Sequence, residues 1–405
     1  MAGWNIFITF AIIIKVIIII LITNITMKNN DISNPFIVSK SIPDELFCDR
    51  KEETALLVKH IENGRNVVLM SPRRLGKTGL IHHFFSQKQI AEKYYTFFVD
   101  IYPASTLQEM CYIFGKAVFE RLKSKKEKQL EAFFKTIKSL RAGFKVDPLT
   151  GEPSIELGIG TIENPSTTLE EIFTYLEEAD EPCIVAFDEF QQIAEFQEKR
   201  VEATLRGIIQ NCHNTSFIFS GSRQHSIERM FHSKSRPFYQ SAQLMDLRPL
   251  NREVYTAFAC HLFSLCGKQL DSTVVSTIYD DYEGTTWYMQ MMLNELFAIT
   301  GAGQTCTPDM LPQARQNIID IQEGAYQTQL SMLSPKQKLV LQAIAHEGAV
   351  KSATSGAFIK KYSLDSASSI QSAIKGLHDK EIISNTGNGT RIYDYFFAWW
   401  LKSNY

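Results

Sequence analysis

The sequence has almost no excess charge and no ordered pattern of cysteines. Its 42 Lys and Arg residues nearly balance 44 Asp and Glu residues, which leaves a formal net charge of −2. Bulk electrostatics therefore does not indicate a nucleic-acid or anionic-surface partner. The seven cysteines are scattered and show no C-x-x-C spacing, which argues against a disulfide framework or a zinc site and favours a reducing compartment. We therefore expect a cytoplasmic protein.

The N-terminus lacks the basic region and the small-residue cleavage site of a removed signal peptide. Residues 6–26 are nevertheless almost wholly apolar and long enough to span a bilayer. A charge at mid-membrane, as at Lys15, costs about 2.5–3.5 kcal/mol. Three interpretations stay open: a single-pass anchor with Lys28 on the cytoplasmic side, a buried or interfacial segment, or sequence upstream of a true start at Met27. The isoleucine-rich, leucine-poor composition and the polar residues after Met27 favour the third.

The chain is long enough for two or three domains, and its 44% hydrophobic content is sufficient for real cores. Up to residue 249, short apolar runs alternate with helical patterns, which predicts an α/β domain with a parallel sheet covered on both faces. The five expected strands are Val67–Met70, Tyr95–Asp100, Pro182–Asp188, Ser216–Ser222 and Ala242–Leu247. Residues 143–160 alternate and turn, which predicts an inserted β-hairpin.

The pattern becomes wholly helical after Pro249. The last part of the chain, from about Leu333, predicts three helices and two short strands, the composition of a winged helix-turn-helix. The expected domains are an apolar N-terminal segment at 1–33, an α/β domain at 34–249, a helical domain at 250–332 and a winged helix at 333–405.

The most informative stretch is Val67–Leu80, VVLMSPRRLGKTGL. A buried strand followed by Gly-Lys-Thr at a helix start is what a phosphate-binding loop requires, because helix N-terminal amides face the anion. Gly76 lets the main chain approach closely, Lys77 reaches the terminal phosphates, and Thr78 offers a hydroxyl to Mg²⁺. The expected phosphate-binding residues are Ser71, Pro72, Arg73, Arg74, Leu75, Gly76, Lys77, Thr78 and Gly79. Ser71 holds the position of the usual first glycine, so a second element is needed.

That element is the apolar run that ends in Asp188-Glu189. A buried parallel strand that delivers acids at its C-terminal edge indicates a magnesium and water site, although a buried strand before a solvated acidic turn gives the same pattern. We expect Asp188 to hold Mg²⁺ together with Thr78. We expect Glu189 to orient and polarise the water that attacks the γ-phosphate. Together with the loop, this pair predicts nucleotide binding.

With these parts in place, residues 34–405 resemble the archaeal-type ATPases of the STAND class, common in archaea and Bacteroidetes and related to AAA+ and origin-recognition ATPases. The motifs that carry the resemblance are Asn34-Pro35-Phe36, Asp49-Arg50, SPRRLGKTGL, Asp188-Glu189, Ser220-Gly221-Ser222, Leu247-Arg248-Pro249-Leu250 and the terminal Asp394-Tyr395-Phe396-Phe397-Ala398-Trp399-Trp400. The resemblance implies an additional-strand P-loop domain, a helical lid at 250–332 and a C-terminal winged helix. It also implies a preference for ATP over GTP, and the sequence contains no N-K-x-D guanine signature.

By the same resemblance, Ser222 stands where a polar sensor residue contacts the γ-phosphate or the attacking water. The expected catalytic residues are therefore Lys77, Glu189 and Ser222. Two departures concern the lid and the C-terminus. The lid motif, 284–288, lacks the proline that marks the start of the nucleotide-sensing helix, and Tyr395 replaces another proline.

The arginines leave alternatives open. Arg73 and Arg74 either contact phosphate or anchor the loop through nearby carboxylates. Arg206, Arg223 and Arg236 are candidates for an arginine finger, supplied in cis or by a neighbouring copy in a homo-oligomer.

Three functions agree with these features. The leading one is an ATP-dependent conformational switch with slow hydrolysis, whose winged helix presents or conceals a surface for an unidentified protein partner. The second is a DNA-binding regulator, because the last unit is modestly basic, although its expected recognition helix offers only Gln371, Ser372 and Lys375 to bases. The third is a membrane-tethered ATPase, which depends solely on residues 6–26.

Overall fold

The structure is a computed structural model that describes residues 33–39, 42–123, 127–139, 144–146, 153–155, 162–221 and 224–405. The apolar segment 6–26, most of the hairpin region 143–160, and Ser222 and Arg223 lie outside these residues. None of the helices among the described residues is long and apolar enough to cross a membrane. The chain forms two compact units. One is Ser41–Leu250, and the other is Asn251–Tyr405 together with the N-terminal residues 33–39.

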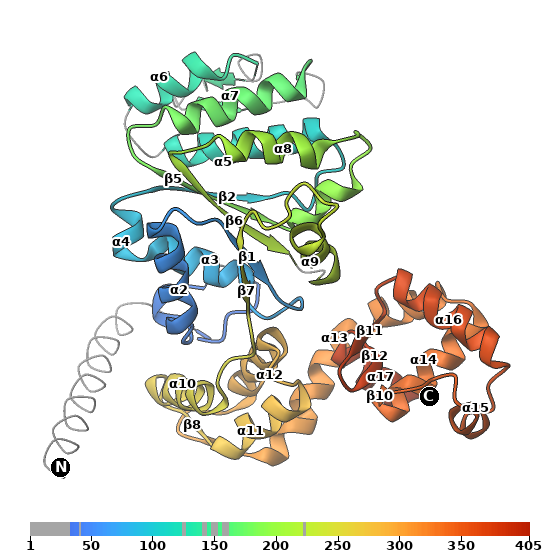
Figure 1. Cartoon of the computed structure of the whole chain (residues 1–405). Helices are drawn as coiled ribbons and strands as arrows, with labels where there is room; N and C mark the ends of the chain where they lie inside the picture. Colours follow the sequence, from blue (N-terminus) through green and yellow to red (C-terminus); the bar gives the residue numbers. More distant parts are fainter. Residues whose placement is uncertain are drawn as a thin grey trace, which may run out of the picture. The chain divides into compact units, whose positions relative to one another are not determined.

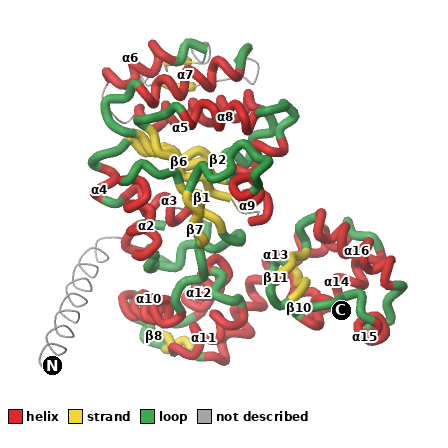
Figure 2. The backbone as a smooth tube through the Cα atoms, viewed as in Figure 1, coloured by secondary structure: helices red, strands yellow, loops and turns green. Residues whose placement is uncertain are grey.

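A five-stranded parallel sheet forms the centre of the unit Ser41–Leu250 (Figure 2). Its strands are β1 (Val67–Met70), β2 (Tyr95–Asp100), β5 (Cys183–Asp188), β6 (Thr215–Gly221) and β7 (Gln243–Asp246), in the order β2-β5-β6-β1-β7. All neighbouring pairs in this order are parallel. Strand β6 separates the loop strand β1 from the carboxylate strand β5, which confirms the predicted P-loop sheet of the additional-strand type.

Helices cover both faces of this sheet (Figure 1). One face carries α2 (Lys51–Glu62), α3 (Lys77–Ser86) and α4 (Lys88–Ala91); the other carries α5 (Leu107–Lys123), α6 (Glu127–Thr136), α7 (Pro165–Glu177), α8 (Val201–Gln210) and α9 (Gln224–His232). Two short 3₁₀ helices are η1 (Asp44–Leu46) and η3 (Phe190–Glu195). Along β5 the side chains alternate, so that Ile184 belongs to the first core and Val185 to the second. Both faces are buried, which explains why the strands are continuous apolar runs in the sequence.

Helix α7 begins at Pro165, and Asn164 is its N-cap residue. The side chain of Asn164 accepts a hydrogen bond from the Thr167 amide at 3.3 Å. Asparagine is among the best N-cap residues, and Pro165 follows at the first helical position, where its missing N–H costs nothing. Nearby, β3 (Phe144–Val146) and β4 (Pro153–Ile155) pair antiparallel.

The helical part of the other unit contains α10 (Arg252–Leu265), α11 (Ser272–Asp281), α12 (Thr286–Ile299), η4 (Pro308–Met310) and α13 (Leu311–Ser331), with β8 (Gln269–Leu270) and β9 (Thr305–Cys306). Helix α13 lies in the part of the chain that the sequence predicts to be helical, but its own bounds were not predicted. Its apolar stripe is weak, because the buried face includes small or polar side chains such as Ala314 and Tyr326 between the aliphatic residues.

The predicted winged helix-turn-helix is confirmed. It consists of α14 (Pro335–Glu347), β10 (Ala349–Val350), α15 (Gly356–Lys361), α16 (Ala367–Asp379), β11 (Ile383–Thr386), β12 (Gly389–Ile392) and α17 (Tyr395–Asn404), with sheet order β10-β12-β11. Ser334 caps α14 in a reciprocal capping box with Gln337. Strand β10 and helix α17 were not assigned from the sequence.

Aromatic contacts join the winged helix to α11 and α12 within this unit. Tyr282 and Tyr288 stack on each other with ring centroids 5.6 Å apart, and Phe396 lies 5.4 Å from both rings. At the turn between α11 and α12, Glu283 forms an ion pair of 2.7 Å with Arg391 of β12. The segment that the family resemblance marks as a lid motif is therefore packed against the wing and the terminal helix.

Candidate nucleotide-binding site

The loop between β1 and α3 closes through a left-handed glycine. Gly76 has φ 90°, a conformation that other residues adopt only with strain, and it immediately precedes the first residue of α3. A Cβ atom built on Gly76 would meet nothing within 4 Å, so its backbone conformation, and not lack of space, requires glycine. The first amides of α3, a helix of ten residues, lie at this loop end, where the sequence predicts phosphate binding.

Lys77 is buried under this loop. Only 6% of it is exposed, and its Nζ donates hydrogen bonds to the carbonyl of Ser71 at 3.3 Å, the Oγ of Ser71 at 3.1 Å and the carbonyl of Pro72 at 3.3 Å. Burial lowers the pKa of the Lys77 ammonium, while the carboxylates of Glu189 and Asp188 act against that shift. Ser71, which replaces the usual glycine, thus supplies two oxygens to the lysine.

Thr78 and Asp188 meet across 110 residues of sequence. The Thr78 hydroxyl donates a hydrogen bond to Asp188 Oδ2 at 2.7 Å, and the Glu189 amide donates to Asp188 Oδ1 at 3.1 Å. A hydroxyl and a carboxylate are oxygen ligands of the kind that Mg²⁺ prefers. The described residues contain no group of three or more His, Cys, Asp or Glu that could hold a metal ion. The pair therefore fits Mg²⁺ only where phosphate and water complete the coordination.

Glu189 is oriented by a residue that the sequence analysis did not identify. Glu189 is the N-cap residue of η3, and its φ of 54° lies in the left-handed region. The residue that orients it is Gln191, whose Nε2 donates a hydrogen bond of 2.5 Å to Glu189 Oε2. Gln191 is 4% exposed, so it holds the carboxylate from inside the protein. The sequence signal that could have identified Gln191 is its position as a polar residue two places after Glu189.

Gly221, at the end of β6, leaves the space that Gln191 occupies. A Cβ atom on Gly221 would lie 2.4 Å from Gln191 Oε1 and 2.8 Å from Ile227 Cδ1. No described atom forms a hydrogen bond with Gln191 Oε1. The next residue, Ser222, lies outside the described residues, so its sensor role stays a prediction.

A third carboxylate lies at the same edge of the sheet. Asp100 ends β2 and pairs in register with Asp188 on β5. Burial raises the pKa of Asp100, and the negative charges of Asp188 and Glu189 add to that effect. The C-terminal edge of the sheet is therefore the acidic side of the site, next to the loop lysine.

Two of the three candidate arginine fingers, Arg206 and Arg236, lie among the described residues. Arg236 forms an ion pair with Glu202 of α8, beside a cavity of about 310 Å³. Burial raises the pKa of Glu202, and the guanidinium of Arg236 acts against that shift. Arg206 lies partly buried on α8, and Arg223 lies outside the described residues. In the loop itself, Arg73 lies close enough to contribute to the lowered pKa of Lys77.

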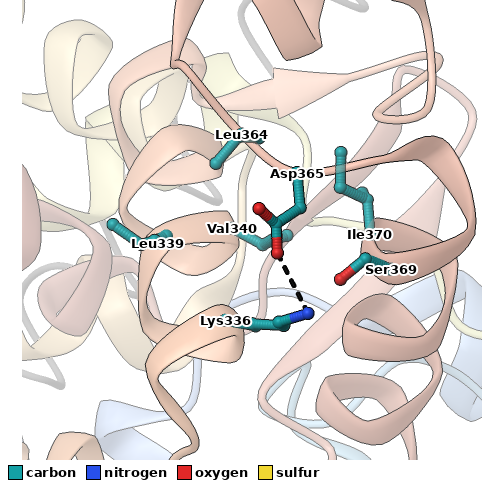
Figure 3. Close-up of a pocket in the computed structure, with 7 residues that line it drawn as sticks. All are labelled: Lys336, Leu339, Val340, Leu364, Asp365, Ser369 and Ile370. Atoms are coloured by element: carbon teal, nitrogen blue, oxygen red, sulfur yellow. Dashed lines mark ion pairs between the residues drawn. The ribbon is translucent and has the colours of Figure 1, made fainter.

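Several of the basic side chains of the winged helix are engaged by acids. Lys361 contacts Glu347 at 2.6 Å, and Lys336 contacts Asp365 at 3.0 Å. Figure 3 shows the second pair facing each other beside a hollow between α14 and the start of α16. The hollow holds about 10 Å³, which is roughly the space of one water molecule.

The helix expected to read DNA has little basic character. On α16 the side chains of Gln371, Ser372 and Lys375 are exposed, as predicted. His378 and Asp379 follow on the exposed surface. Lys375 on the helix and Lys380 at its C-cap, with Asp379 between them in the sequence, give a weak attraction for phosphate.

Comparisons with known proteins agree with this architecture. The structure resembles a Walker-type ATPase of Pyrococcus abyssi with a TM-score of 0.62 and 18% identity, covering 91% of this chain and 99% of that chain. The chain has the fold of a P-loop ATPase. It also resembles the ORC2 protein of Aeropyrum pernix in its ADPNP-ADP complexes, with a TM-score of 0.57 and 13% identity, covering 91% of this chain and 95% of that one.

Residues 324–403 match a family model described as a probable winged helix domain. No curated protein matches the sequence. The predicted similarity to archaeal ATPases of the AAA+ and origin-recognition type is thereby confirmed at the level of fold. Sequence identities of 18% and 13% carry no information about activity. Assignment to the STAND class stays a prediction.

Proposed function

We propose that this P-loop protein binds ATP with Mg²⁺ at residues 71–79 and hydrolyses it slowly, as a conformational switch. The observation that carries the proposal is the Thr78–Asp188 hydrogen bond of 2.7 Å. It places the loop hydroxyl and the strand carboxylate at one point, and the buried ammonium of Lys77 is the next residue along the chain. A cation beside a hydroxyl and carboxylate pair is the arrangement that phosphoryl transfer requires.

The loop binds phosphate by exchanging internal contacts for contacts to the anion. Lys77 now donates to oxygens of Ser71 and Pro72, and phosphate oxygens can replace these acceptors without moving the helix. The amides at the start of α3 add further donors. Although burial lowers the pKa of Lys77, a triphosphate favours its charged form.

Thr78 and Asp188 are the residues that would hold Mg²⁺. When bound, Mg²⁺ neutralises charge that develops on the phosphates. Asp188 is oriented for this by the Glu189 amide, which donates to the oxygen that does not contact Thr78.

Glu189 is the proposed general base. Its carboxylate orients a water molecule and accepts a proton from it, while Gln191 fixes one carboxylate oxygen at 2.5 Å. Ser222 would assist as a polar group at the end of β6, as the family resemblance implies. The base thus depends on a short strand-to-helix connection, Asp188 to Gln191, that is buried on the core side.

The winged helix is proposed as the part that presents or conceals a protein-docking surface. Its aromatic contacts to Tyr282 and Tyr288 attach it to the segment implied to be the lid. The ion pairs of Lys336, Lys361 and Arg391 reduce the charge available for DNA, which favours a protein partner. A gel shift at low salt tests the DNA alternative, because phosphate contacts strengthen as salt falls.

The proposed compartment is the cytoplasm. All seven cysteines are free thiols in the structure. Burial raises the pKa of Cys111 and Cys183 to about 12, so neither is a reactive thiolate at neutral pH.

A homo-oligomer that supplies an arginine finger is part of the proposal. Light scattering with and without ATP measures the oligomeric state.

The test of hydrolysis is Glu189→Gln in the full chain. The amide keeps the shape but cannot accept the proton, so we expect ATP affinity within threefold of the wild type and turnover lower by about 10²-fold or more. Glu178→Gln, an exposed acid at the end of α7, is the matched control. Unchanged steady-state turnover in Glu189→Gln would show that this residue is not the base.

A further inference from the structure

A buried arginine outside the loop contacts the loop main chain. Arg50 is 4% exposed and caps α2 with φ 62°. The preceding residue, Asp49, also has a positive φ of 54°. Two consecutive residues other than glycine in the left-handed region are held there only when their surroundings fix them.

The guanidinium of Arg50 joins three segments of the unit Ser41–Leu250. Its NH2 group donates to the Leu75 carbonyl at 3.2 Å, and its NH1 group donates to the Arg248 carbonyl at 2.6 Å and to Glu53 Oε1 at 2.8 Å. Leu75 immediately precedes Gly76 in the loop. Arg248 follows β7, shortly before the chain passes into the other unit.

The contact with Leu75 orients one peptide of the phosphate loop. A trans peptide is planar, with its C=O and N–H pointing in opposite directions. Holding the Leu75 carbonyl toward Arg50 therefore directs the Gly76 N–H away from Arg50. The planar guanidinium has several donors in fixed directions, so one side chain can hold this carbonyl and that of Arg248 together. A lysine in its place offers only a single nitrogen.

We propose that Arg50 is a positioning residue of the nucleotide site: it preforms the Leu75–Gly76 peptide for phosphate binding and ties it to the main chain that leaves β7. This inference rests on the proposed function, because it concerns how the same loop is held. Arg50 contacts neither Glu189 nor Gln191 in any described hydrogen bond. Its loss is expected to weaken ATP binding and to leave the turnover of bound ATP little changed.

The test uses the full chain with Arg50→Gly. Glycine accepts the positive φ at this position, so the substitution removes the side chain without adding backbone strain, and it leaves a space that free guanidinium can enter. We expect Kd for ATP·Mg²⁺ and KM to rise at least tenfold, with kcat within threefold. Low millimolar guanidinium should recover at least threefold of the affinity, and methylammonium at the same concentration should not.

Arg200→Gly is the matched control. Arg200 also caps a helix, α8, with a positive φ of 70°, but it is exposed. Its Kd for ATP·Mg²⁺ is expected within twofold of the wild type. If Arg50→Gly does not fold, Arg50→Lys serves for the same measurements, with an expected intermediate loss of affinity.

A second readout needs no nucleotide. Amide hydrogen exchange at residues 71–76 and 247–250 should be at least tenfold faster in Arg50→Gly, and unchanged in Arg200→Gly. If the wild type binds ATP while the Arg50 variant binds it equally well, or if exchange is unchanged, the inference is wrong and the proposed function stands. If the wild type binds no ATP, both are wrong. Loss of affinity with faster exchange and guanidinium rescue supports the inference.

Discussion

The contact between Gly221 and Gln191 gives the sharpest structural prediction. In Gly221→Ala the added Cβ would lie 2.4 Å from Gln191 Oε1 and 2.8 Å from Ile227 Cδ1. Real Cβ atoms do not approach this closely, so Gln191 must move. Its amide donates to Glu189 Oε2, and the displaced side chain therefore releases the proposed base.

The size of the effect follows from these distances. Relieving the contact with Gln191 Oε1 requires a shift of roughly 1 Å, and a misplacement of that size in an active site lowers turnover by about 10²-fold. Overpacking a buried site costs about 1–3 kcal/mol of folding stability. Ground-state ATP affinity should stay within threefold, because Lys77 and Thr78 do not contact Gly221 in any described interaction.

The assay compares turnover, ATP affinity and chemical denaturation for the wild type and three variants. Gly207→Ala is the control: this glycine lies within α8, and a Cβ there meets nothing within 4 Å, so alanine should stabilise the protein by about 0.5–1 kcal/mol. The double variant Gly221→Ala with Gln191→Ala should regain part of the lost stability but not the turnover. Wild-type turnover in Gly221→Ala would refute the proposed link from Gly221 through Gln191 to Glu189.

Two further predictions concern pH and the winged helix. Burial, together with the charges of Arg65 and Lys59, lowers the pKa of His60 below its ordinary 6.5. The unfolded state therefore binds more protons than the folded state, and the free energy of unfolding falls as pH decreases through about 6.5. Urea denaturation between about pH 7 and 5 should show a shallower loss in His60→Gln, and an identical slope would contradict this. Arg391→Gln removes the ion pair with Glu283 and the cation–π contact with the Tyr395 ring, whose centroid lies 4.0 Å from the guanidinium carbon. It should cost about 1–3 kcal/mol in the unit that contains it, measured by differential scanning calorimetry; an unchanged transition would contradict this prediction.

The strands and the phosphate loop could be predicted because their signals are local. A strand buried on both faces is a continuous apolar run, as in β5, whose six residues are all buried. Gly76 and Ser334 also stand where local backbone chemistry requires them: a left-handed loop end and a helix cap. The bounds of helix α13 were not predicted, because a stripe that includes Ala314 and Tyr326 gives little apolar periodicity.

The contacts that complete the site could not be predicted, because they depend on the three-dimensional fold. The Arg50 guanidinium reaches a carbonyl 198 residues away, and no sequence spacing indicates that pairing. Gln191 faces Gly221 only because β5 and β6 are neighbours in register. The acids themselves were predicted by their position after an apolar run, whereas the residues that orient them were not.

Nucleotide binding is tested most directly by titrating ATP·Mg²⁺ into the full chain by isothermal calorimetry, in parallel with Lys77→Met. Lys77 donates to three loop oxygens and is the only loop ammonium within residues 71–79. The wild type should show saturable binding heat, and Lys77→Met should bind at least tenfold more weakly, about 1.4 kcal/mol or more. No saturable heat for the folded wild type, or equal affinity in the variant, would contradict ATP binding at residues 71–79.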